Sequence, residues 1–466
     1  MRNMRGGGLI EVKPTDITVL WGTQAELHGN LRPCPFTDET QGERADLWVE
    51  GWISLDDYFV WRVKVLEAGD YEVAVTYSCA FGPGGSKYEI AVGDSKIDGV
   101  VHKTYGWLPG WGVAWTSFER EQLNETLYLP KGVNTIKLYA TTKPDRGEVM
   151  RLYTLELIPL ATKSILVSAE ERARRMRAST EWFTSAGYGV TFHWTARTQP
   201  RRGSMKPFPK AVRDFDVNAF ADMVQETGAG YTIFTSTHEP HIFPAPIQAM
   251  ERILPGSTCQ RDLIGEIADA LSERGIKLIL YYPAGRSEGE WGKVSGWVED
   301  RTRYFSNFCA IFREMGRRYG RKVMGYWFDF CPFNVPHHFE PLYKAAKTGN
   351  PDRIIAWNSW IIRRPTYFQE YWAGEAGDAL VIPEAEVFGD LQPHVWIYLD
   401  DEWVHDKPNT DIHPPIFHTQ QLINYVETCI ARGIVVSMNL GIYQDGTISK
   451  ETFKQMRALR KAIRGD

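Results

Sequence analysis

The run from Val323 to Phe330 (Val-Met-Gly-Tyr-Trp-Phe-Asp-Phe) ends a hydrophobic segment on a single carboxylate, Asp329. It follows a helical pattern over residues 301–319, so it has the form of a strand that comes after a helix. In a barrel of alternating strands and helices, the carboxyl ends of the strands form the active face. Asp329 is therefore a candidate catalytic carboxylate, and the alternative is that it caps the loop that follows.

Other polar side chains stand at the ends of other predicted strands. His193 follows one hydrophobic run, His238 follows Phe-Thr-Ser-Thr, and Tyr281 follows Leu-Ile-Leu. Each of them alone is more often a structural residue. Because parallel strands bring their carboxyl ends together, we expect His193, His238, Tyr281 and Asp329 to share one pocket.

The elements that would position these residues lie in the second part of the chain. From residue 185 onward, hydrophobic strands alternate with helical patterns, as at 260–274 and 301–319, which indicates parallel strand–helix–strand units. The predicted strands are 188–194, 230–235, 277–282, 323–330, 353–360, 394–399 and 434–441. We predict an α/β fold with a TIM-type (β/α)8 barrel over residues 185–466.

The first part of the chain has a different pattern of apolar and polar residues. Between residues 10 and 160, short segments alternate apolar and polar residues and are separated by Gly, Pro, Asp and Asn, which predicts an all-β sandwich domain. The predicted strands are 58–65, 69–77, 87–93, 125–129, 134–140 and 153–157. Residues 161–184, rich in Ala, Glu and Arg, predict a connecting helix.

A single strand-end carboxylate does not suffice for glycoside hydrolysis. One carboxylate attacks the anomeric carbon, while a second group protonates the leaving oxygen and later deprotonates water. The carboxylates that follow Asp329 and could serve are Glu370, Glu375, Glu384, Glu386, Asp400 and Asp401. Spacing alone does not choose among them.

About 280 C-terminal residues resemble the barrel of the family 29 glycoside hydrolases, the α-L-fucosidases. The Trp327-Phe328-Asp329 segment is similar to the strand that carries the family's nucleophile, and residues 437–448 are similar to the family's closing motif. Further segments that resemble family motifs are Phe192-His193-Trp194, 215–221, Phe234 to His238, and 261–266 running into Leu280-Tyr281-Tyr282.

The resemblance implies a retaining exo-glycosidase with Asp329 as its nucleophile. The segment from Trp372 to Gly377 is similar to the family's acid/base segment, and Glu375 lies 46 positions after Asp329. Glu375 is therefore the predicted acid/base, with Glu384 and Glu386 as alternatives. The predicted substrate-binding residues are His193, Trp194, His238, Glu239, Tyr281, Trp327 and Trp372, with the His and Tyr side chains on hydroxyl groups and Trp327 on the sugar ring.

Two positions depart from the family pattern. Glu239 replaces the second His of a His pair, and Phe330 stands where the nucleophile motif has Gly. A buried pocket that loses a hydrogen-bond partner rejects its former ligand. The alternatives to a fucosidase are therefore a glycosidase of the same mechanism that acts on a sugar other than fucose, and a relative that binds carbohydrate without hydrolysing it.

The first domain resembles the carbohydrate-binding modules attached to such enzymes, although the usual arrangement places the module after the barrel. The segment 107–115 holds Trp107, Trp111 and Trp115. These rings could form a sugar platform, complete the barrel's pocket, or join the two domains. The whole chain is 13% aromatic with 17 Trp, a composition that favours sugar binding slightly, although aromatic-rich cores would also explain it.

Composition also bears on partners and on location. The net charge is −5 with interspersed signs, so the expected partner is a carbohydrate and neither a nucleic acid nor a membrane; exposed Trp residues would suit a homo-oligomer. We see no secretion signal and expect a cytoplasmic protein.

We predict no cofactor and no metal. The six cysteines show no CxxC spacing, so neither a zinc knuckle nor a small disulfide framework is implied. A metal-dependent hydrolase built from His193, His238, His241 and Asp329 is the third alternative, although those spacings match no closed zinc pattern.

Overall fold

The computed structural model describes residues 8–34, 48–80, 82–104, 118–284, 289–297, 300–329, 336–359, 362–384 and 388–465. The chain forms two compact units. One comprises residues 1–172 together with 360–363, and the other comprises residues 173–359 and 364–466. Phe330, Glu386 and the tryptophan-rich segment 107–115 lie outside the described residues.

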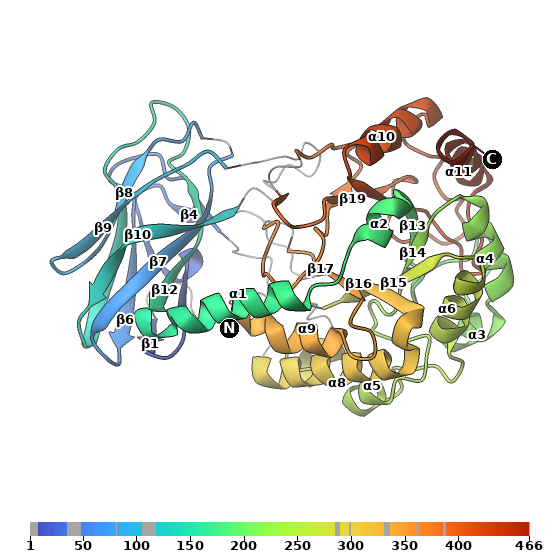
Figure 1. The fold of residues 1–466 in the computed structure, drawn as a ribbon, viewed down its shortest axis with the longest axis horizontal. Coiled ribbons are helices and arrows are strands. Elements are labelled where there is room, and N and C mark those ends of the chain that lie inside the picture. Colours follow the sequence, from blue (N-terminus) through green and yellow to red (C-terminus); the bar gives the residue numbers. More distant parts are fainter. Residues whose placement is uncertain are drawn as a thin grey trace. The chain divides into compact units, whose positions relative to one another are not determined.

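The first unit is built from two β-sheets, drawn in blue and blue-green in Figure 1. One sheet has the order β1-β6-β11-β8-β9, with β3 on β6, and the other has the order β10-β7-β12-β5-β4, with β2 on β12. The strands are β1 (Leu9–Val12), β2 (Thr18–Trp21), β3 (Glu26–His28), β4 (Arg32–Pro33), β5 (Val49–Glu50), β6 (Tyr58–Val65), β7 (Gly69–Ser78), β8 (Lys87–Val92), β9 (Ser95–Val100), β10 (Glu119–Leu129), β11 (Gly132–Ala140) and β12 (Arg151–Pro159).

Alternation along the strands explains why these sheets pack face to face. In β6, Phe59, Trp61 and Val63 are buried, whereas Arg62 and Lys64 between them are exposed. Side chains from both sheets, including Phe59 of β6 and Val73 of β7, belong to one hydrophobic core. A strand whose alternate residues are apolar buries one face and leaves the other to solvent, which is the pattern of a sandwich.

Two helices replace the predicted connecting helix of residues 161–184. Helix α1 covers Lys163–Met176, and α2 covers Glu181–Ala186 and ends at Gly187, whose φ is +71°. Phe183 of α2 is fully buried in the barrel core, where its ring contacts Tyr231 and Tyr371. Phe183 thus anchors the short helix α2 to the barrel core.

The second unit contains an eight-stranded parallel sheet, seen between the helices in Figure 1. Its order is β17-β16-β15-β14-β13-β20-β19-β18, the cyclic order of a (β/α)8 barrel. The strands are β13 (Tyr188–Phe192), β14 (Tyr231–Thr235), β15 (Lys277–Pro283), β16 (Val323–Asp329), β17 (Ile354–Trp357), β18 (Glu375–Gly377), β19 (His394–Tyr398) and β20 (Val435–Asn439).

Helices cover the outside of this sheet (Figure 1). They are α3 (Phe208–Asp214), α4 (Val217–Glu226), α5 (Gln248–Ile253), α6 (Leu263–Glu273), α7 (Gly289–Val294), α8 (Arg301–Tyr319), α9 (Glu340–Ala346), α10 (Thr419–Ala431) and α11 (Lys450–Arg464). Aspartates 216, 262 and 300 cap α4, α6 and α8, each accepting from the backbone three residues on. These caps fix where each helix starts after its loop.

Glu370 closes the barrel between β17 and β18. Its backbone N–H donates to the Ile355 carbonyl at 2.9 Å, and its Oε2 accepts from the Ile355 N–H at 2.8 Å. Its Oε1 accepts from the Lys347 ammonium at 2.6 Å and also from the Tyr343 hydroxyl. Burial lowers the pKa of Lys347, and the negative charge of Glu370 acts in the opposite direction. Glu370 thus ties β17 to the segment that leads into β18 through both its backbone and its carboxylate.

We expect Glu370→Gln to destabilise the protein by about 3 kcal/mol, because it leaves the buried Lys347 without its negative partner. Urea unfolding of the variant and the unaltered chain would measure this difference. Glu273→Gln, at an exposed position of α6, is the matched control and should shift stability by no more than about 0.5 kcal/mol. Equal unfolding midpoints for Glu370→Gln and the unaltered chain would contradict this role.

The predicted fold class, a TIM-type barrel preceded by an all-β domain, is confirmed. The sequence patterns did not reveal strands β1 to β5 and β9 in the first unit, or β18 in the barrel. Several predicted barrel strands were too long; β17, for example, covers 354–357 where 353–360 was predicted. In the part of the chain that is described, no helix is long and apolar enough to cross a membrane.

Candidate active site

Asp329 lies at the carboxyl end of β16 and faces the barrel interior. Its neighbours Tyr326 and Phe328 point the other way, against Phe312 of α8, whereas Trp327 belongs to the barrel core. Residues two apart on a strand share a face, so Asp329 follows Trp327 inward. Only 8% of Asp329 is exposed.

Two side chains from neighbouring strands donate hydrogen bonds to Asp329. The Tyr281 hydroxyl of β15 donates to Oδ2 at 2.7 Å, and Nδ2 of Asn358, just after β17, donates to Oδ1 at 2.9 Å. Both donors favour the ionised form of this carboxylate. Asp329 is therefore held as an acceptor on both of its oxygens.

Asn358 also reaches the second carboxylate. The same Nδ2 atom donates to Oε2 of Glu375 at 2.6 Å. Since Asp329 Oδ1 and Glu375 Oε2 lie 2.9 and 2.6 Å from one nitrogen, they are at most 5.5 Å apart, the sum of the two lengths. Retaining glycosidases hold their two carboxyl groups about 5 to 5.5 Å apart.

Gly374 allows Glu375 to reach this position. Its φ is +67°, and a Cβ atom at Gly374 would lie 2.1 Å from the carbonyl oxygen of His394. Any other residue would therefore push this segment away from β19. The backbone of Glu375 pairs with Trp396 of β19, which places the carboxylate at the rim of the barrel interior.

Aromatic rings line the interior beside the two carboxylates. The rings of His238 and Trp327 are nearly parallel to that of Tyr281, with centroid distances of 5.7 and 5.6 Å. Trp396 of β19 meets Trp327 edge-on at 4.3 Å. The Trp327 indole N–H donates to the Ala373 carbonyl at 3.0 Å, which fixes the ring. Flat rings next to polar groups are suited to the apolar faces and hydroxyls of a sugar.

His193 stands in this cluster as a neutral imidazole. Its Nδ1 lies 2.9 Å from Oδ1 of Asn439, whose Nδ2 donates to the carbonyls of Glu402 and Trp403. Asn439 Oδ1 is thus an acceptor, so the His193 proton is assigned to Nδ1 and Nε2 is the ring's acceptor. Burial lowers the pKa of His193 to about 4, which keeps the ring uncharged at neutral pH.

Three predicted substrate-binding residues have their contacts elsewhere than at Asp329. Trp194 faces the outer layer, where its ring packs on Phe208 and its indole donates to the Gln444 carbonyl. Glu239 is 40% exposed in its side chain and pairs with Arg197 at 3.4 Å. Trp372 is buried with its ring 5.1 Å from that of Phe388.

Glu239 nevertheless bears on the cluster through its backbone. Its N–H donates to Nδ1 of His238 at 2.9 Å. His238 Nδ1 is therefore an acceptor, and in the neutral ring the proton is on Nε2. Glu239, which replaces the second His of the family's pair, thus sets the tautomer of His238 through its backbone N–H.

The other candidate carboxylates have different surroundings. Glu370 is buried in the barrel closure described above, and Asp401 and Glu384 are exposed. Asp400 is fully buried and accepts from the Thr452 hydroxyl at 2.6 Å and from the Gly441 N–H at 2.8 Å. It joins the end of β19 to the start of α11.

Burial raises the pKa of Asp400 from 3.8 to about 7, with Glu402 adding to the rise. Because the folded protein holds this proton longer than the unfolded chain, stability falls as pH rises from about 4 to about 7 and then levels off. We expect Asp400→Asn to match the unaltered chain near pH 4 and to exceed it at pH 8 by a few kcal/mol, because each tenfold change in proton affinity corresponds to about 1.4 kcal/mol.

Denaturant unfolding at the two pH values would measure this effect of Asp400→Asn. An asparagine preserves both contacts, since its Oδ1 can accept from Gly441 and its Nδ2 can donate to Thr452. The exposed neighbour is the control: Asp401→Asn should leave the pH dependence unchanged. If Asp400→Asn were less stable than the unaltered chain at pH 8, the expected direction of the stability change would be contradicted.

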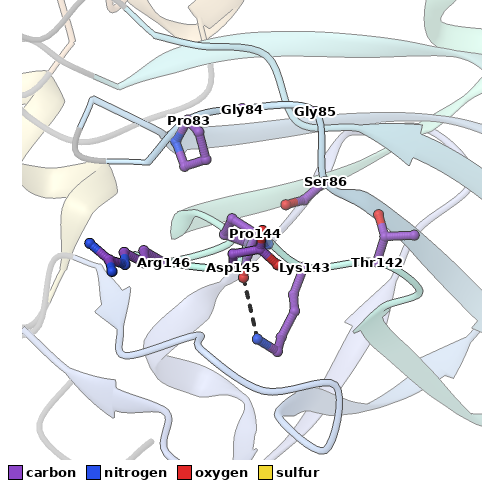
Figure 2. Close-up of a pocket in the computed structure, with 9 residues that line it drawn as sticks. All are labelled: Pro83, Gly84, Gly85, Ser86, Thr142, Lys143, Pro144, Asp145 and Arg146. Atoms are coloured by element: carbon purple, nitrogen blue, oxygen red, sulfur yellow. Dashed lines mark hydrogen bonds between the residues drawn. The ribbon is translucent and has the colours of Figure 1, made fainter.

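A separate hollow lies in the first unit. It has a volume of about 540 Å³, and Figure 2 shows it between the segments 83–86 and 142–146. Lys143 Nζ, from one of these segments, donates to the Pro144 carbonyl at 3.3 Å. None of the nine described residues that line it is aromatic, so it offers no ring for a sugar to stack on. Among the described residues, no three His, Cys, Asp or Glu side chains form a group that could hold a metal.

The family model for alpha-L-fucosidase matches residues 204–462, more than half of the chain. The chain belongs to the α-L-fucosidase family. This α-L-fucosidase family member is accordingly a glycoside hydrolase, and the matched range includes Asp329, Asn358 and Glu375.

Solved structures of fucosidases resemble this family member. The α-L-fucosidase AlfC from Lactobacillus casei, in complex with α-L-fucose product, is 15% identical, with a TM-score of 0.45 over 60% of this chain and 96% of its own. A GH29 α-L-fucosidase from Bacteroides thetaiotaomicron, trapped as a covalent intermediate, is 14% identical, with a TM-score of 0.44 over 62% of this chain and 76% of its own. A search of curated proteins gave no match.

Proposed function

We propose that this protein is a retaining exo-glycosidase that removes α-L-fucosyl residues from carbohydrates. The observation that carries this proposal is the pair Asp329 and Glu375, whose oxygens share the Asn358 amide and lie within 5.5 Å of each other. For Oδ1 of Asp329 and Oε2 of Glu375 this bound fits the separation of about 5 to 5.5 Å in retaining enzymes and lies below the roughly 6.5 to 9.5 Å of inverting ones. Family membership supplies the fucoside as the first substrate to test.

In the first step, an oxygen of Asp329 forms a bond to the anomeric carbon while the glycosidic bond breaks. Glu375 gives its proton to the departing oxygen and becomes a carboxylate. The Tyr281 hydroxyl, 2.7 Å from Asp329 Oδ2, keeps the nucleophile ionised and oriented. The product is a glycosyl ester of Asp329 with inverted configuration, and the aglycone leaves as an alcohol.

In the second step, Glu375 takes a proton from water, and the resulting hydroxyl bonds to the anomeric carbon. The bond to Asp329 breaks and the carboxylate is restored, so two inversions give net retention. The neutral His193 ring and the His238 ring would bind hydroxyl groups of the sugar, and Tyr281 and Trp327 would form the wall against its ring.

The experiment that tests this function is a panel of aryl glycosides, α-L-fucoside included, with proton NMR of the first sugar released. We expect hydrolysis of the α-L-fucoside with an α-configured initial product. A 2-fluoro-fucosyl fluoride should label the peptide that contains Asp329, because the fluorine slows the second step more than the first. A β-configured product, or no turnover and no label from the folded protein, would refute the proposal.

A further inference from the structure

We propose that Asn358 is a positioning residue that holds the Asp329 and Glu375 carboxyl groups together and donates to whichever of them carries the negative charge at each step. This inference rests on the proposed function, because it concerns the same two carboxylates. It adds a residue that takes part in neither bond formation nor proton transfer.

The position of Asn358 is fixed by the barrel itself. It directly follows β17, its backbone N–H donates to the Phe328 carbonyl of β16 at 2.8 Å, and only 3% of it is exposed. Its amide nitrogen has two hydrogens and makes two hydrogen bonds, one to each carboxylate. The spacing of the pair is therefore set by one rigid planar group on a strand end.

During the reaction the negative charge passes from one carboxyl group of the pair to the other, while the total charge of the pair stays the same. Before attack, Asp329 is ionised and Glu375 holds the proton; in the glycosyl-enzyme, Asp329 is an ester and Glu375 is ionised. Asn358 contacts both groups, so in each state one of its hydrogens meets a carboxylate, the stronger acceptor. Because Glu375 Oε2 accepts from Asn358, the Glu375 proton is directed to the other oxygen, Oε1.

The other titratable groups that face the pair do not perform this task. The Tyr281 hydroxyl donates to Asp329, His238 stacks on Tyr281, and neutral His193 bonds Asn439. Asn358 is the described side chain that bonds both carboxylates, and it brings no charge of its own.

Asn358→Asp tests the proposal, because it keeps the shape and replaces the donor by a third carboxyl group. When ionised, the introduced carboxylate can only repel its neighbours; when protonated, it can donate one hydrogen bond. We expect kcat/KM to fall about 100-fold at pH 7 and to recover toward pH 5, so the optimum moves to lower pH. Asn358→Ala, which cannot donate at any pH, should lose a similar factor without recovery, with both limbs of the profile at higher pH.

Asn350→Asp is the matched control. Asn350 is a fully buried asparagine whose Nδ2 donates to the Val323 carbonyl at the start of the same strand, β16, away from Asp329. The Asn350→Asp substitution should lower the unfolding midpoint of the protein without changing the shape of its pH–rate profile. The proposal would be overturned if the pH–rate profiles of both Asn358 variants kept the shape seen for the unaltered chain, and if their rates fell only in proportion to the amount of folded protein.

The result also separates this inference from the proposed function. If the unaltered chain fails to hydrolyse the glycoside, or if Asp329→Ala retains full activity, the function itself is wrong. If Asp329→Ala is inactive and the Asn358 variants keep the unaltered pH profile, only the role of Asn358 is wrong.

Discussion

Asp329→Ala is expected to lower kcat/KM for an aryl α-L-fucoside by at least about 10³-fold, the largest loss of any single substitution in this chain. The substitution removes the atom that would bond to the anomeric carbon, and it removes the acceptor of the Tyr281 hydroxyl bond and of one of the two Asn358 bonds. The measurement is initial-rate kinetics, with circular dichroism and an unfolding curve to show that the variant is folded. Asp401→Ala, at the exposed strand-end carboxylate, is the control and should retain activity.

Azide gives Asp329→Ala a stereochemical signature. Azide is small enough to enter the space left by the carboxylate and would attack the anomeric carbon once, while Glu375 still protonates the leaving oxygen. One displacement inverts the configuration, so a β-fucosyl azide is expected. An α-configured azide, or undiminished hydrolysis without azide, would show that Asp329 is not the nucleophile.

Much of the barrel could be predicted because its strands are hydrophobic runs between amphipathic helices. The runs at 323–330 and 394–399 differ from β16 and β19 by only one residue at the end. The same rule missed β18, since Glu375-Ala376-Gly377 has no hydrophobic run and pairs only through its backbone with β19. Its place depends on tertiary contacts, above all the close approach of Gly374 to His394.

The site was predictable only in part, for similar reasons. Neighbours on a strand face opposite sides, and the structure accordingly has His193 inside and Trp194 against Phe208 in the outer layer. Sequence spacing could not rank the carboxylates after Asp329, because burial and partners decide the role of each: Glu370 faces Lys347 and Asp400 faces Thr452.

Asn358 gave no signal of its own in the sequence. An amide is neither a nucleophile nor an acid, so a search for reactive groups passes over it. Its place directly after the hydrophobic run 354–357 is the one feature that could have drawn attention, because it is a strand-end position like those of His193 and Asp329. Strand-end amides therefore belong in such a search alongside the titratable groups.

Glu375→Ala is expected to have an effect that depends on the leaving group. With 4-nitrophenol, which leaves without a proton, the first step should be little affected, whereas the second step loses its base and kcat should fall about 10² to 10⁴-fold. With a sugar or methyl leaving group the first step needs the proton, so kcat/KM should fall by a similar factor. Kinetics on a series of leaving groups, ranked by the pKa of the departing alcohol, would measure this divergence.

Azide distinguishes this variant from Asp329→Ala by the configuration of its product. In Glu375→Ala the glycosyl ester of Asp329 still forms, and azide attacks it without needing a base, so the rate should recover. Two displacements have then taken place, and the product should be the α-fucosyl azide, opposite to that from Asp329→Ala. Glu384→Ala is the control at the exposed alternative carboxylate. Should Glu384→Ala show the leaving-group dependence and Glu375→Ala not, the proton would come from Glu384, and the carboxylate beside Asn358 would have only a structural role.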